Sequence, residues 1–114
     1  MDSTTKTLSS KYELELLQLQ RQSFVFLISK KTCKPCTFLK PELIKKCQEE
    51  KIDLYMAERG QDEELDAYVG VKKVPYVIVF REGELIDGLQ HSNIKKVWPF
   101  VDDRIHELVF EDNF

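Results

Sequence analysis

The chain has 114 residues, of which 42% are hydrophobic and 32% are charged, with a formal net charge of -3. This length allows one compact domain with its own hydrophobic core and is too short for two. With only 4 Gly and 4 Pro, the composition excludes collagen-like, mucin-like and disordered chains. The slightly acidic balance argues against a dedicated nucleic-acid binder, whose domain is usually markedly basic.

The sequence offers no apolar segment that could enter a membrane. The longest apolar run, residues 24–28, is far shorter than the roughly 20 residues that span a bilayer. Residues 1–7 are polar and lead into a segment rich in Glu and Gln rather than into a signal peptide. Three cysteines, two of them close together, do not make the disulfide framework of a secreted scaffold. We therefore predict a cytoplasmic monomer with no nucleic-acid or membrane partner.

The first predicted elements are an arm and a helix. Residues 1–8 are small and polar without an apolar period, which predicts a flexible arm ahead of a single domain over residues 9–114. Ser10 and Glu13 fit a capping box, and apolar residues at helical spacing then predict a helix through about Arg21.

Short apolar runs predict the strands. Residues 23–29 predict a strand buried on both faces, because the residues between Ser23 and Ser29 are all apolar and mostly aromatic or β-branched. Further strands are predicted over residues 52–57, 74–80 and 84–89, and the last two form a hairpin. Three more helices are predicted: one that ends near residue 50, contains Pro41 and has Phe38, Leu39, Leu43, Ile44 and Cys47 on one side; a short one closed by Gly70; and one over residues 92–110. This order predicts an α/β fold with a central mixed sheet and helices on both faces.

The motif that carries chemistry is Cys33-Lys34-Pro35-Cys36, between the buried strand and the first turn of the next helix. The free N–H groups and the dipole of a helix N-terminus favour a thiolate, so the pKa of Cys33 should be depressed and its thiol nucleophilic. Cys36, one turn further on, would be the thiol that closes the ring. Pro35 suits its position because the first helical residues need no N–H donor.

Other interpretations of the cysteines stay open. A tetrahedral zinc site needs four ligands, and Cys47, His91 and His106 offer no matching spacing, so we expect no metal. Cys33 and Cys36 could also be neighbours only as small apolar residues. Cys47 keeps helical spacing with the apolar residues before it, which favours a buried structural thiol over a second redox role.

Beyond this motif, the sequence resembles the thioredoxin family over about residues 23–88. The residues that carry the resemblance are the strand followed by Cys33-Lys34-Pro35-Cys36, Pro41 in the next helix, Tyr68-Val69-Gly70-Val71 ahead of Val74-Pro75, and Phe80-Arg81-Glu82-Gly83-Glu84.

The resemblance implies a thioredoxin fold and a thiol–disulfide oxidoreductase. Cys33 would attack a disulfide of a protein substrate and Cys36 would resolve the mixed disulfide. Pro75 would be a cis-proline facing the cysteines, although a trans proline is also ordinary at a strand end. The chain has no cofactor-binding motif, and the family's electron donor is a separate NADPH-dependent flavoprotein reductase. The expected substrate-binding residues are Thr32, Lys34, Pro35, Lys73, Val74 and Pro75.

The chain departs from the family pattern at four positions, one of which is Lys34 in place of the usual small glycine. Leu27 and Met56 stand where thioredoxins usually have a buried acid and its lysine partner, so the usual proton acceptor for Cys36 is missing. Resolution should then be slower, or should rely on water or on the departing partner's thiolate. Both members of the pair are absent, which leaves no buried charge unpaired. Thr32 stands where tryptophan is usual, which predicts a narrower range of substrates.

A group of lysines is expected around the cysteines: Lys30, Lys31, Lys34, Lys72 and Lys73. Such a basic rim would lower the pKa of Cys33 and steer acidic partners to the site. A stabilised thiolate also makes the disulfide a better oxidant, so we predict a couple more oxidising than that of a typical thioredoxin. The alternative is that these are ordinary solvated loop lysines.

The leading functional prediction is a thioredoxin-like disulfide reductase that acts on protein substrates. One alternative is an interaction or accessory module without redox turnover, which the missing tryptophan and acid–lysine pair favour and the intact cysteine pair with Pro75 opposes. A second alternative is a disulfide oxidant or isomerase.

Overall fold

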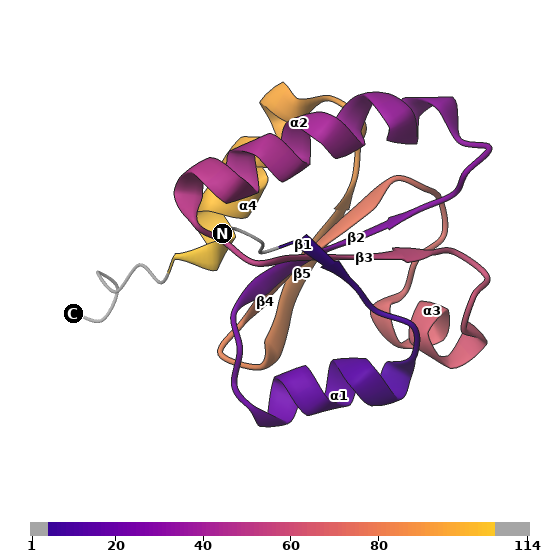
Figure 1. Ribbon diagram of the computed structural model, residues 1–114, viewed down its shortest axis with the longest axis vertical. Coiled ribbons are helices and arrows are strands. Elements are labelled where there is room, and N and C mark those ends of the chain that lie inside the picture. The colour runs from indigo at the N-terminus through magenta and orange to yellow at the C-terminus, as the bar shows by residue number, and fades with distance from the viewer. Residues whose placement is uncertain (1–4, 107–114) are drawn as a thin grey trace.

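The computed structural model describes residues 5–106, in which strands and helices alternate except where one strand follows another directly in the final hairpin (Figure 1). The strands are β1 (Thr5–Thr7), β2 (Phe24–Ser29), β3 (Leu54–Glu58), β4 (Tyr76–Arg81) and β5 (Glu84–Gln90). The helices are α1 (Lys11–Leu19), α2 (Lys34–Glu50), α3 (Glu63–Val69) and α4 (Ile94–Ile105).

The strands form one mixed sheet in the order β1-β3-β2-β4-β5. Strands β1 and β2 run parallel to β3, whereas β4 runs antiparallel to β2 and to β5. In Figure 1, α2 and α4 cover one face of the sheet and α1 and α3 cover the other. This is the mixed sheet with helices on both faces that the order of the elements predicts.

Strand β2 lies at the centre of the sheet, and all six of its residues are buried. Its side chains alternate between two apolar clusters because successive residues of a strand point to opposite faces. Val25 and Leu27 pack on the side of α2 and α4, whereas Phe24, Phe26 and Ile28 pack on the side of α1 and α3. The prediction of a strand buried on both faces is confirmed.

Polar side chains fix the start of each helix on the α1 side. The hydroxyl of Ser10 accepts a hydrogen bond from the Glu13 N–H at 3.2 Å, and the Glu13 carboxylate accepts one from the Ser9 N–H at 2.6 Å. Asp62 caps α3 and also accepts a hydrogen bond from the Lys11 N–H at 3.0 Å, so it joins the two helices. These backbone donors, that of Lys11 foremost, hold the pKa of Asp62 below its ordinary value.

The structure corrects the prediction of a flexible arm over residues 1–8. Residues 5–7 form β1, which pairs with β3 at the edge of the sheet, and Leu8 is buried in the core. A polar edge strand of three residues has no apolar period to reveal it, because only the side chain that follows it enters the core. Residues 1–4 lie outside the described residues.

The end of the predicted last helix also lies partly outside the description. Helix α4 begins after Asn93, whose side chain accepts a hydrogen bond from the Lys95 N–H, and it ends at Ile105. Residues 107–110 of the predicted helix are not among the described residues. Within residues 5–106, none of the helices has the length and apolar character that crossing a membrane requires.

Candidate functional site

The cysteine pair lies where β2 leaves the sheet and α2 begins. Cys33 is the N-cap of α2, and its Sγ accepts a hydrogen bond from the Cys36 N–H at 3.1 Å. The two cysteines form a disulfide, with their Cα atoms 5.3 Å apart. Cys33 is partly exposed, whereas Cys36 is only 2% exposed. A molecule approaching from solvent therefore meets Cys33 first.

The loop before β4 approaches the cysteines from the other side. The Val74–Pro75 peptide bond is cis, as the resemblance implies, and the Val74 carbonyl oxygen lies 3.9 Å from the Sγ of Cys33. Pro75 itself is buried. The structure thus brings Val74 and Pro75 to the motif from a segment about forty residues further along the chain.

The other expected substrate-binding residues lie next to the cysteines or next to Val74 in the sequence, and all of them are exposed. Thr32, Lys34 and Pro35 adjoin the cysteines in sequence and are exposed. Lys73 precedes Val74 and is also exposed.

Lys72 has a different setting from the other lysines of the expected basic rim. It lines a hollow together with Arg59, Glu63 and Asp66, so two cations and two carboxylates gather there. The expected basic rim is therefore not purely basic at Lys72.

The two substituted positions of the family's buried ion pair are direct neighbours in the sheet. Leu27 of β2 is the register partner of Met56 of β3. Leu27 is fully buried in the cluster that includes Leu39 and Leu43 of α2, and Met56 packs against the same cluster. The space beneath the first turns of α2 is therefore apolar.

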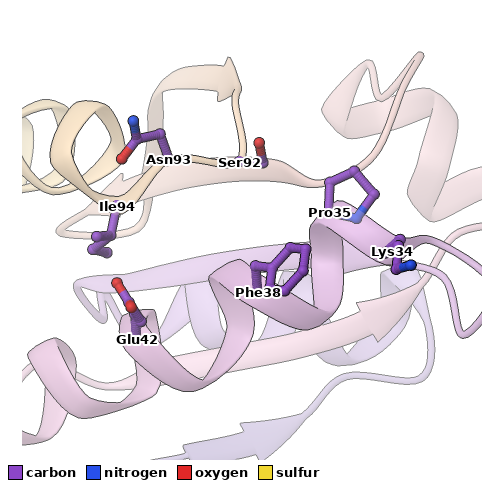
Figure 2. Close-up of a pocket in the computed structure, with 7 residues that line it drawn as sticks. All are labelled: Lys34, Pro35, Phe38, Glu42, Ser92, Asn93 and Ile94. Carbon is purple, nitrogen blue, oxygen red and sulfur yellow. The ribbon is translucent and has the colours of Figure 1, made fainter.

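A groove runs along α2 from the cysteine motif (Figure 2). Its volume is about 480 Å³, and in the close-up Ile94 points toward Glu42 across it. It is lined by Lys34, Pro35, Phe38, Glu42, Ser92, Asn93 and Ile94.

The sequence places Phe38 on the same side of α2 as Leu39 and Leu43, but the side chain of Phe38 is 66% exposed and lines this groove. Helical spacing alone could not separate it from Leu39, the next residue, which is buried. The sequence prediction therefore missed this exposed aromatic side chain on the second turn of α2.

A smaller pocket, of about 220 Å³, lies beside Cys36. It is lined by Lys30, Lys31, Cys36, Thr37, Lys40 and Pro41. Lys40 was not among the predicted site residues. The available signal was its spacing, since residues four apart on a helix share a face and Lys40 follows Cys36 by four.

Cys47 is a buried thiol, as its helical spacing predicts. Its exposure is zero, and burial together with the nearby Asp53 carboxylate raises its pKa to about 12. Burial and the raised pKa both disfavour a reactive thiolate at this position. Among residues 5–106, no three His, Cys, Asp or Glu side chains gather closely enough to hold a metal ion.

Several solved structures similar to this one are thioredoxins. The thioredoxin of Malassezia sympodialis (Mala s 13) is 16% identical, with a TM-score of 0.80 over 93% of this chain and 97% of the other. Mitochondrial thioredoxin 3 of Saccharomyces cerevisiae, in its oxidised form, is 19% identical, with a TM-score of 0.80 over 89% of this chain and 99% of the other. A mutant thioredoxin of Halobacterium salinarum is 14% identical, with a TM-score of 0.81 over 95% of this chain and 98% of the other. These likenesses establish the thioredoxin fold.

At the level of sequence, no curated protein matches the chain. The family model described as hydrogenase-1 expression protein HyaE matches residues 20–98. That range runs from the end of α1 into α4 and includes both cysteines and Pro75. Since the match covers more than half of the sequence, the chain belongs to the HyaE family of hydrogenase-1 expression proteins.

Proposed function

We propose that this protein is a thiol–disulfide oxidoreductase that exchanges disulfides with protein partners through Cys33 and Cys36. The observation that carries the proposal is the difference in exposure within the disulfide: Cys33 is open to solvent at the N-terminus of α2, and Cys36 is buried behind it. This is the arrangement that a two-step exchange requires. The first thiol must reach a large partner, and the second has to reach only the first.

The proposed reaction begins with reduced Cys33 as a thiolate. Its sulfur attacks one sulfur of the partner's disulfide, which forms a mixed disulfide and releases the other partner sulfur as a thiolate. Cys36, as a thiolate, then attacks the Sγ of Cys33. The Cys33–Cys36 disulfide forms, and the second partner sulfur leaves, so two electrons have passed from the protein to the partner. A separate NADPH-dependent flavoprotein reductase would restore the dithiol, and we expect this cycle to run in the cytoplasm with a monomeric protein.

Residues around the disulfide would hold the partner. Thr32, Lys34 and Pro35 offer an exposed surface on one side of Cys33, and Lys73, Val74 and Pro75 lie on the other. Thr32 places a small hydroxyl where thioredoxins usually have tryptophan. Because a broad aromatic surface binds many partner sequences and a small hydroxyl does not, the range of partners should be narrow. The lysines favour a partner with acidic residues near its disulfide.

A second candidate function is an accessory module for hydrogenase expression that binds its partner without redox turnover. The family assignment favours it, as does the apolar Leu27–Met56 pair beneath the cysteines. In that case the groove along α2, with its exposed Phe38, would be the working surface.

Reaction of the reduced protein with dithionitrobenzoate, a symmetric aromatic disulfide, separates the two functions. We expect the wild-type protein to release two equivalents of coloured thionitrobenzoate, one as Cys33 attacks and one as Cys36 resolves. Cys36→Ser should release one equivalent and retain the other on Cys33, as mass spectrometry would show. Cys33→Ser is the matched control, and it should react slowly because Cys36 is buried. A wild-type protein that stops at one equivalent has no resolving thiol, and the accessory function would then stand.

A further inference from the structure

The pocket beside Cys36 has an unusual balance of charge. Apart from the Cys36 thiol, its ionisable lining groups are three lysines, Lys30, Lys31 and Lys40, and no carboxylate lines it. Among the described residues, none of these lysines has a carboxylate oxygen within ion-pair distance. Within that part of the chain, no ion pair therefore neutralises these positive charges, and Glu58 only shares the adjoining pocket with Lys40.

Lys40 is the member of this group that the fold holds in place. It follows Cys36 by one turn of α2, which puts the two Cβ atoms on one face at about 5–6 Å. It is half-buried, whereas Lys30 and Lys31 are exposed. Lys40 also lines the adjoining pocket together with Met56. It thus borders both Cys36 and the position where the sheet lacks an ionisable group.

We propose that Lys40 is a positioning residue for Cys36, whose ammonium group, aided by Lys30 and Lys31, stabilises the Cys36 thiolate in the resolving step. This inference rests on the proposed oxidoreductase function. Burial disfavours ionisation of a thiol, and a nearby cation favours it. Lys40 on the helix would then favour the Cys36 thiolate through its charge and so offset the effect of burial on ionisation. A carboxylate in the sheet would instead accept the proton of the thiol.

The resolving step balances without a protein base. The Cys36 thiol loses its proton to water through the open pocket, and its sulfur attacks the Sγ of Cys33 in the mixed disulfide. The bond between Cys33 and the partner sulfur breaks, and the partner leaves as a thiolate that takes a proton from water. Lys40 takes no part in the proton transfer and contributes only its charge.

The charged groups near Cys36 come from three segments. The loop after β2 supplies Lys30 and Lys31, and α2 supplies Lys40 and, two residues before Cys36, the exposed Lys34. Strand β3 supplies Glu58, which lines the adjoining pocket with Lys40 and partly offsets its effect. The strand beneath, β2, presents Leu27 and carries no charge there. Of these groups, the half-buried Lys40 should act most strongly, because exposed charges are screened by water and salt.

The first test is the pH dependence of Cys36 alkylation by iodoacetamide in a Cys33→Ser background, where no second active-site thiol titrates. Changing Lys40→Gln should raise the midpoint by about half a pH unit, as expected for one unit charge at this distance near a protein surface. Lys40→Arg should restore the midpoint. Lys45→Gln removes the same charge from an exposed position on α2 and should leave the midpoint unchanged.

The second test uses the two phases of thionitrobenzoate release with both cysteines present. Below the midpoint, Lys40→Gln should slow the second phase about twofold, because a thiol of higher pKa is less ionised but more nucleophilic once ionised. The first phase should not change. If the wild-type protein shows no second phase, the proposed function fails. If the second phase is present and Lys40→Gln matches Lys45→Gln in both tests, this inference fails and the function stands.

Discussion

The two cysteines of the disulfide and the third cysteine differ only in where α2 places them. Cys33 caps the helix, Cys36 faces inward one turn later, and Cys47 lies in the middle of the core. Because ionisation controls thiol reactivity, position alone assigns chemistry to the first two and packing to the third.

For Cys47 we predict that the reduced native protein never exposes a third reactive thiol. Since burial and Asp53 raise the pKa of Cys47 to about 12, raising the pH from 7 to about 9 should leave it protonated and unreactive, even though a free thiol of ordinary pKa near 8.5 ionises over that range. Thiol counting with an alkylating reagent should give two groups in buffer and three in denaturant. Three reactive thiols in the native protein at either pH would contradict the burial of Cys47.

At the scale of elements, the neighbouring strands β2 and β3 set the environment beneath α2. Leu27 and Met56 are register partners, so these two departures from the thioredoxin pattern occupy one place in the sheet. An apolar pair at this place packs with α2 and requires no desolvated charge. In an ion pair there, the attraction between the charges would have to exceed the free-energy cost of burying them.

The strand pair predicts a clear order of stability among three proteins. Leu27→Asp places an unpaired carboxylate at a position with no exposure, which should cost about 3–5 kcal/mol at pH 7. Adding Met56→Lys should recover part of this loss because the new ammonium group lies on the register partner. Urea unfolding midpoints measure the order, and Met56→Lys alone is the control. A double variant no more stable than Leu27→Asp would show that the two side chains do not interact.

The strong local signals in the sequence predict most of these elements. Strand β2 is an unbroken apolar run, Ser10 and Glu13 cap α1, and Gly70 ends α3 in the left-handed conformation that favours glycine. Strand β1 escapes prediction because its own three residues are polar and its pairing with β3 is a long-range contact. Phe38 and Lys40 escape because helical spacing gives the face of a residue, but not which part of that face a neighbouring element leaves open.

At the scale of the whole molecule, the fold gathers distant segments at one end of the sheet. The end of β2, the start of α2 and the loop before β4 meet at Cys33, and the groove continues between α2 and the segment leading into α4 (Figure 2). From the sequence, only the resemblance to thioredoxins indicates that the cysteine motif and Val74–Pro75 belong to one site. Their contact, at 3.9 Å, comes from the antiparallel pairing of β4 with β2.

The charge at this end of the molecule predicts the equilibrium behaviour of the disulfide. Lys30, Lys31 and Lys40 line the pocket of Cys36, and Lys34 is the residue after Cys33, so reduction creates thiolate character within a positive field. Because this stabilises the reduced protein, the Cys33–Cys36 couple should be more oxidising than the about -270 mV of thioredoxin. Thiol counting across glutathione and dithiothreitol buffers, with Cys47→Ser to remove the third thiol, measures the potential.

High salt is the internal control: screening of the lysines should move the potential back toward that of thioredoxin. A potential at or below about -270 mV, unchanged by salt, would mean that the lysines do not act on the sulfurs. A couple that stays reduced in every buffer would remove the oxidoreductase function and leave the groove along α2 as the basis of a binding role.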